Sequence, residues 1–269
     1  MSYPSTAAIN INLILSSLLL LSAQSIAAEE TPPPCDLPES ADEHMEYKVS
    51  YMRIPIGTVD LYYSDEGDGC GLIVMETFPN IGFLRVYTEY FGLLADDGFI
   101  RESHFWQDEG DYWEYGNLER HPPTNSVTLV EYTADRQFGR LRDRTEIDRS
   151  HYASPVHNAT SLIRTVRRDI AGAGATRERE TQYPFYHEGS RETIPVLRHA
   201  GVETVSVDAF EGECDVVSTE IDLDFEGVHG LRDALKVQFT ADGSAVPVYV
   251  EARIVIGRVR LELTGYEGG

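Results

Sequence analysis

The chain has 269 residues and a formal net charge of -23, with 45 acidic residues against 22 lysines and arginines. This length allows one large β domain or two small ones with a substantial buried core. The acidic excess disfavours nucleic acid and anionic membrane surfaces as partners, since both are negatively charged. Only Lys48 and Lys236 are lysines, a balance that suits a salty medium or a GC-rich genome.

Residues 1–28 have the pattern of a signal peptide. Residues 13–21 form an apolar core too short to span a bilayer, and 25–28 supply small residues for cleavage. No lysine or arginine precedes that core, so an uncleaved anchor remains an alternative. We expect export to the periplasm, with secretion or envelope association also open. No stable membrane span is expected after cleavage.

The mature chain is predicted to consist of a leader and one domain. Residues 29–45 are rich in proline and acidic residues and should be disordered. No long linker divides 46–269, which we predict to be a single β-rich domain. Its first strand, 46–53, alternates Tyr47, Val49 and Tyr51, and should pair with 58–64.

The three cysteines suit an oxidising compartment. If 58–64 pairs in turn with 70–78, Cys35 and Cys70 lie toward the same end of the sheet. We therefore favour a disulfide between Cys35 and Cys70, with Cys214 as a small core residue. Sequence alone does not fix this connectivity.

The middle of the chain has the spacing of a meander of short strands. Segments 85–94 and 99–107 are joined by Asp96-Asp97-Gly98, a strong hairpin signal. The further strand candidates are 112–115, 126–132, 181–186, 192–197, 203–209, 214–222 and 236–239.

One helix is predicted between Asn158, which can cap its start, and Gly172, which can end it. Its apolar residues recur at helical spacing along a single face, which should cover the concave side or the open end of a curved sheet. These residues are Ala159, Leu162, Ile163, Val166 and Ile170.

The last apolar run, 246–263, alternates with period two and changes parity at Gly257. A two-residue hairpin with Ile256 and Gly257 at the turn would force an isoleucine to positive φ. We therefore interpret Gly257 as a β-bulge that bends one long strand. Residues 253–261 also match 53–61 as R-I-x-I-G-x-V-x-L. This match arises either by chance or because the first and last strands bend alike, side by side.

These patterns predict a mainly β fold: a single strongly curved antiparallel sheet or open barrel, built as a meander, with one covering α-helix. Three stretches carry a family resemblance: Y-x-V-x-Y-x-x-I-P-I-G at 47–57, H-N-A-T-S-L-I-R-T-V-R at 157–167, and D-G-S-A-V-P-V at 242–248 with I-x-I-G-x-V at 254–259. Together they resemble the exported bacterial domain-of-unknown-function family 3108.

The resemblance implies a periplasmic, β-rich protein with a strongly curved sheet, and it supplies no accepted catalytic residues. The chain departs from the family pattern before the closing turn. Phe239-Thr240-Ala241 stands where a tryptophan is frequent in the family.

A first candidate site is the aromatic and acidic stretch 104–115, which holds both tryptophans. Aromatic faces beside carboxylates suit stacking against sugar rings, and paired carboxylates suit acid/base work on a glycosidic bond. The alternative is a hairpin whose aromatics alternate between core and rim. The candidate ligand-binding residues are His104, Trp106, Tyr112, Trp113 and Tyr115, and the candidate catalytic carboxylates are Asp108, Glu109 and Asp111.

A second candidate site precedes and enters the predicted helix. It consists of His151, Tyr152, His157, Arg164 and Arg167. The tyrosine and histidines could carry protons while an arginine neutralises a carboxylate, as β-elimination on an acidic polysaccharide requires. The alternative is a loop followed by a solvated arginine face. No histidine pair or Cys-x-x-Cys has metal-ligand spacing, so neither a metal nor another cofactor is expected.

The favoured hypothesis for the function is a non-enzymatic exported protein that binds an apolar or glycan envelope ligand in its curved sheet. The alternatives are a polysaccharide-active lyase or hydrolase and an interaction subunit of an envelope assembly with an unknown protein partner.

Overall fold

The structure is a computed structural model that describes residues 41–64, 70–77, 87–108, 112–121, 124, 126–137, 139–151, 155–173, 177–187, 190–210, 212–222, 231–254 and 257–268. Within these ranges the chain forms a 15-stranded antiparallel sheet and one helix, α2 (Ala159–Ala173). The strands are β1 (Glu43–Tyr51), β2 (Ile54–Tyr63), β3 (Cys70–Thr77), β4 (Tyr87–Leu94), β5 (Ile100–Asp108), β6 (Trp113–His121), β7 (Ser126–Ala134), β8 (Arg142–His151), β9 (Arg179–His187), β10 (Ser190–Arg198), β11 (Glu203–Ser206), β12 (Glu213–Ile221), β13 (Leu231–Thr240), β14 (Pro247–Ile254) and β15 (Gly257–Gly268).

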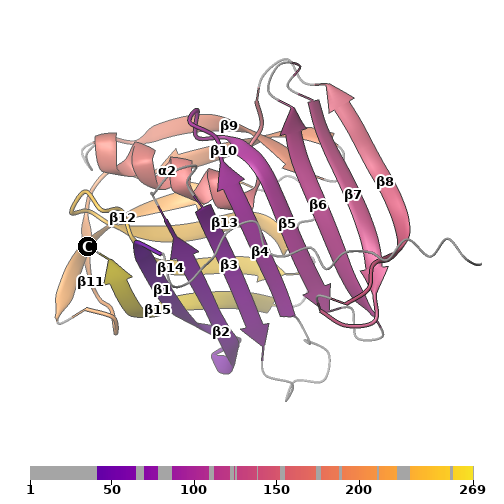
Figure 1. Ribbon diagram of the computed structural model, residues 1–269. Coiled ribbons are helices and arrows are strands. Elements are labelled where there is room, and N and C mark those ends of the chain that lie inside the picture. The colour runs from indigo at the N-terminus through magenta and orange to yellow at the C-terminus, as the bar shows by residue number, and fades with distance from the viewer. Residues whose placement is uncertain are drawn as a thin grey trace, which may run out of the picture.

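The sheet is a long meander that curves around the helix without closing, which confirms the predicted fold class (Figure 1). Its strand order is β8-β7-β6-β5-β4-β3-β2-β1-β15-β14-β13-β12-β10-β9, with β11 paired to β12. The N- and C-terminal strands lie side by side in the middle, from Glu43 opposite Gly268 to Tyr51 opposite Val259. β1 starts at Glu43, earlier than the expected domain start at residue 46.

The segment before the helix reaches the edge strand β9. His157 forms an isolated parallel bridge with Phe185, donating its backbone N–H to the Pro184 carbonyl at 2.8 Å. The neighbouring Val156 is fully buried in a cluster that combines residues of β5, β6 and β7 with Tyr186 of β9. Apolar packing thus joins the two halves of the open sheet where strand pairing does not.

The interpretation of Gly257 as a bulge was wrong. β14 and β15 are an antiparallel hairpin in which Ile254 pairs with Gly257, leaving 255 and 256 as the connection. Gly257 has φ 103° and follows the connection, so the parity changes because the chain reverses. A β-bulge does occur beside the matching segment 53–61. There Val49 of β1 pairs with Gly57 of β2, whereas the next residue, Ser50, pairs with Pro55.

β8 was not predicted from the sequence. Its sequence, RDRTEIDRSH, is nearly all polar and shows no apolar alternation. An edge strand tolerates such a sequence, because charged residues discourage pairing with another chain. The strand pairs with β7 only and forms one edge of the sheet.

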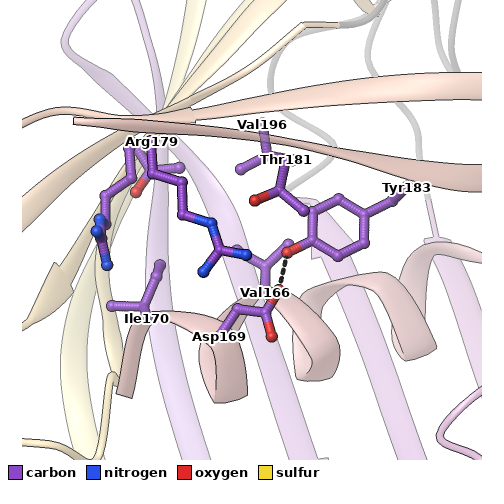
Figure 2. A pocket seen from close by; sticks show the side chains of 9 residues that line it. Val166, Asp169, Ile170, Arg179, Thr181, Tyr183 and Val196 are labelled. Carbon is purple, nitrogen blue, oxygen red and sulfur yellow. Dashed lines mark hydrogen bonds between the residues drawn. The ribbon is translucent and has the colours of Figure 1, made fainter. Parts of the chain in front are cut away.

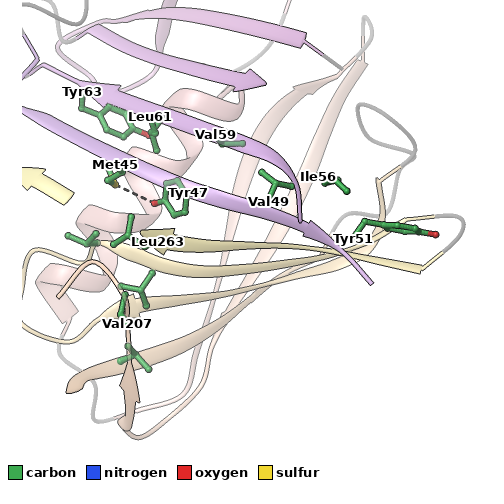
Figure 3. Packing of buried hydrophobic residues seen from close by; sticks show 13 residues of the cluster. Met45, Tyr47, Val49, Tyr51, Ile56, Val59, Leu61, Tyr63, Val207 and Leu263 are labelled. Carbon is green, nitrogen blue, oxygen red and sulfur yellow. Dashed lines mark hydrogen bonds between the residues drawn. The ribbon is translucent and has the colours of Figure 1, made fainter. Parts of the chain in front are cut away.

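The helix forms where its sequence pattern predicts, although Ala159 of the predicted apolar face is exposed and the helix continues past Gly172 to Ala173. Asn158 caps it, accepting the Ser161 backbone N–H at 3.0 Å on its side-chain oxygen. Leu162, Val166 and Ile170 are buried against residues of β9, β10, β12 and β13. A second core lies mainly over β1, β2 and β15 and includes Met45, Tyr47, Val49, Leu61 and Leu263 (Figure 3).

The other side of α2 approaches β4 closely at Gly92. A Cβ at Gly92 would lie 2.5 Å from Thr160 Oγ1 and 3.3 Å from its Cβ. We therefore expect Gly92→Ala to lower the free energy of unfolding by about 1–3 kcal/mol, as overpacking does. Urea denaturation measures it.

Gly172→Ala is the matched control, because no atom lies within 4 Å of its added Cβ. It should be neutral or stabilise the helix slightly. In a double-mutant cycle, Thr160→Ala should recover part of the loss caused by Gly92→Ala. If the double variant loses the sum of the free energies of unfolding lost by the two single variants, the close contact between Gly92 and Thr160 is contradicted.

Candidate functional site

A half-open cavity of about 250 Å³ lies between α2, the start of β1, the end of β2 and the β13–β14 loop. It is polar and holds three guanidinium groups from successive turns of one helix, at i, i+3 and i+4 spacing. We call it the arginine cavity; its lining residues are Asp42, Glu43, Tyr63, Arg164, Arg167, Arg168, Ala171 and Ser244.

Arg167 is the buried anchor of this cavity, with 8% of its surface exposed. Its Nη1 and Nη2 donate to the two carboxylate oxygens of Glu43 at 2.7 and 2.9 Å, a bidentate ion pair. Its Nε donates to the Ala245 carbonyl at 3.1 Å and Nη2 to the Ser244 carbonyl at 3.3 Å. The guanidinium also lies 5.5 Å from the centre of the Tyr63 ring.

Electrostatics keep both partners of this pair charged. Burial raises the pKa of the Glu43 carboxyl, but the hydrogen bonds and charge of Arg167 outweigh it, so the pKa lies below its usual range. Burial lowers the pKa of Arg167, and Glu43 more than offsets that effect. Arg167 is therefore committed to Glu43, and other groups must meet a ligand.

Tyr63 is the cavity's unpartnered donor. Only 4% of the residue is exposed, and its hydroxyl has no hydrogen-bond partner among the described residues. Burial is the main reason that its pKa rises to about 12, so the hydroxyl keeps its proton at neutral pH. A buried donor without an acceptor is costly, and an acceptor entering the cavity would remove that cost.

Arg164, predicted from the sequence, lies in the same cavity. Burial lowers its pKa, and the neighbouring charges of Arg168 and Arg167 lower it further. An anion bound in the cavity would relieve this repulsion.

Of the second candidate site, Arg164 and Arg167 line the cavity, whereas His157 does not. His157 is 2% exposed, stacks on Phe99 with ring centroids 4.2 Å apart, and contacts Ser161 Oγ through Nδ1 at 3.2 Å. Burial lowers its pKa to about 4, so the ring is neutral. Tyr152 lies outside the described residues, so its role stays a prediction.

The aromatic stretch forms a packed cluster on β5 and β6. Trp106 and Tyr115 are each 2% exposed, with ring centroids 4.8 Å apart, so protein covers both faces of these rings. His104 bonds to the Tyr115 hydroxyl and to Glu102 Oε1, and burial lowers its pKa.

The rim of that cluster remains accessible. Tyr112 is 45% exposed, while Trp113 is half-buried and packs edge-on against Tyr87. Asp108 ends β5, and Glu109 and Asp111 lie outside the described residues. A ligand-binding role for Tyr112 and Trp113 stays a prediction.

The disulfide also stays a prediction, because Cys35 lies outside the described residues and the Cys70 side chain is likewise not described. Cys214 is a free, half-buried thiol packed against the core of β1 and β2. In the described part of the chain, no group of three or more His, Cys, Asp or Glu is placed to hold a metal ion. No helix there has the length and apolar character needed to cross a membrane.

Glu43, Tyr63 and Arg168 were not predicted as site residues. The arginine spacing on α2 was a usable signal, because three arginines on one helix are notable in a chain with a net charge of -23. Glu43 and Tyr63 carried no such signal, since each fits an ordinary strand or leader.

The fold has a counterpart among solved structures. The chain is similar to the beta-barrel-like protein of domain of unknown function DUF1849 from Brucella abortus, with a TM-score of 0.50 and 8% sequence identity. The match covers 85% of this chain and 98% of that one. At this identity the likeness concerns the fold alone. No family model and no curated protein matches the sequence.

The ion pair predicts a pH-dependent stability. At pH 7 we expect Glu43→Gln to lower the free energy of unfolding by about 2 kcal/mol, less than a fully buried pair would lose, since 25% of the Glu43 side chain is exposed. Because the folded-state pKa of Glu43 is lowered, its stabilisation is complete above its unfolded pKa and is lost as pH falls through the folded value.

The difference between wild type and Glu43→Gln should therefore be constant above about pH 5 and shrink at lower pH. Urea denaturation of both proteins at a series of pH values measures this difference in the free energy of unfolding. Glu213→Gln, which removes an exposed carboxylate, is the control. A difference that stays constant down to pH 3 would contradict the pairing.

Proposed function

We propose that this is an exported, periplasmic protein that binds the acidic group of an envelope glycan in the arginine cavity. One observation carries the proposal: a half-open cavity lined by Arg164 and Arg168, beside the Arg167–Glu43 pair, and by a buried, unpartnered Tyr63 hydroxyl. Donors of this kind suit a carboxylate or another oxyanion. The lining is polar, which favours a sugar acid over an apolar ligand.

Export and family membership are part of the proposal. The signal-like residues 1–28 support export, and the motifs at 47–57, 157–167 and 242–259 support membership of the exported family 3108. The Brucella abortus protein with a similar fold is itself described as a domain of unknown function.

The chemistry of the cavity favours binding over catalysis. A general base works best with a pKa near the working pH. Tyr63, with a pKa of about 12, keeps its proton at neutral pH and therefore does not act as a base there. Glu43 already accepts three hydrogen bonds from Arg167 and Tyr266, and its pKa lies below its usual range. Neither group is poised to move a proton.

Polysaccharide lyase or hydrolase activity remains the alternative hypothesis. It rests on Tyr152, Glu109 and Asp111, which lie outside the described residues. Loss of product release in Tyr152→Phe, with folding intact, would support it.

Calorimetric titration with trigalacturonate tests the proposed function, with the neutral galactose trimer of the same linkage as the control ligand. We expect the acidic trimer to bind and the neutral one not to bind. Arg168→Gln should weaken binding about tenfold or more, since a hydrogen bond to a charged group contributes about 1.5–3 kcal/mol. Arg140→Gln, which removes an exposed arginine outside the cavity, should bind as the wild type does.

Tyr63→Phe separates a ligand-binding role from a structural one. Removing a buried hydroxyl without a partner should raise the free energy of unfolding by about 1 kcal/mol. The same change should weaken trigalacturonate binding about tenfold, because the donor is lost. Lower stability with unchanged binding would overturn the role assigned to Tyr63, and equal binding of both trimers would overturn the proposed ligand.

A further inference from the structure

A second, much smaller cavity lies on another face of α2, against β9, β10 and β12 (Figure 2). Its volume is about 20 Å³, and it shares no lining residue with the arginine cavity. Three aliphatic side chains form part of its wall beside charged and hydroxyl groups. The lining residues are Val166, Asp169, Ile170, Arg179, Thr181, Tyr183, Val196, Arg198 and Thr219.

Arg198 is a buried cation without a counter-charge. It is 7% exposed, its Nη2 donates to the Arg177 carbonyl at 2.9 Å, and its Nε has no hydrogen-bond partner. It forms no ion pair with a carboxylate of the described residues. Arginines are rarely buried without a paired charge, because removing the charge from water is costly.

Thr219 provides a second unpartnered group at the same point. It is 1% exposed, and its Oγ1 has no hydrogen-bond partner in the described part of the protein. Arg198 and Thr219 are directly opposite one another in the β10–β12 register. Paired residues of neighbouring strands project to the same face, so both orphan groups face one small space.

The carboxylate in this cavity is already engaged. Asp169 accepts a hydrogen bond from the Tyr183 hydroxyl, and the two face each other from helix and sheet (Figure 2). Arg179 adds a second guanidinium to the lining. With two cations and one anion, the cavity carries a net positive charge.

The volume and the net positive charge of this cavity together limit which ligand it can hold. About 20 Å³ holds one water-sized species and is too small for sulfate or phosphate. A water molecule would satisfy Nε of Arg198 but leave its charge unneutralised. We propose that this cavity is a halide site that binds one chloride ion, with Arg198 Nε–H and Thr219 Oγ1–H as donors.

The bound ion would act as the missing counter-charge between α2 and the β10–β12 pair. Binding to the folded state alone raises stability in proportion to the logarithm of ligand concentration. The stability of the protein should therefore respond to chloride specifically and not only to ionic strength. The proposal uses none of the arginine cavity's residues, so it stands or falls separately from the proposed function.

Thermal unfolding of the full chain tests the site, with sodium chloride replacing sodium gluconate at constant ionic strength. We expect the midpoint to start rising once chloride exceeds its dissociation constant and then to increase with the logarithm of the chloride concentration. Thr219→Val should move the onset of this rise to at least tenfold higher chloride, and Arg198→Met should abolish the response. Thr193→Val, an exposed change on the same strand β10, should respond as wild type does.

Crystals grown in bromide give a second readout that does not depend on variants folding. We expect an anomalous bromide peak within hydrogen-bond distance of Arg198 Nε and Thr219 Oγ1. An ordered water in that position without bromide would overturn the proposal. A wild-type midpoint that is the same in chloride and gluconate would also overturn it.

Discussion

The buried ion pair between Arg167 and Glu43 fixes the helix to the middle of the sheet. The two residues are 124 positions apart, yet the pair is bidentate and mostly removed from water. Glu43 begins β1, the strand that pairs with both β2 and β15. The helix is therefore anchored where the first and last strands meet, and the shape of the arginine cavity depends on that attachment.

A single helix serves three structural roles because its faces are chemically distinct. Leu162, Val166 and Ile170 form the apolar stripe that covers the inside of the curved sheet. The arginines three and four residues apart form the wall of one cavity, and Asp169 faces the other. Burial of the apolar stripe provides most of the helix's stability, so the polar faces can hold groups that are unfavourable until a ligand arrives.

Sequence patterns over a few residues predicted the structural features that depend on interactions between neighbouring residues. The Asn158 cap, the apolar stripe of α2 and most strands follow from spacing over a few residues. Gly257 was misinterpreted because a bulge and a reversal produce the same parity change, and only strand pairing separates them. β8 was missed because an edge strand need not alternate apolar and polar residues.

The candidate site was harder to predict because its residues are brought together from distant parts of the sequence. Arg164 could be named from helix spacing, but its surroundings come from β1 and β2, far away in sequence. Tyr63 fits the alternation of a buried strand, and nothing nearby in the sequence indicates that its hydroxyl lacks a partner. Burial and hydrogen-bond satisfaction are properties of the folded chain, so only the structure could identify the donor.

The overall charge limits which anions can use the arginine cavity. A net charge of -23 repels anions at long range, whereas the guanidinium groups attract them over a few ångströms. At physiological ionic strength the Debye length is about 8 Å, so the local attraction dominates once an acidic group is inside. A long polyanion would also lie along the acidic surface and meet repulsion there. The cavity therefore favours an isolated acidic residue or the end of a glycan over a uniformly charged polymer.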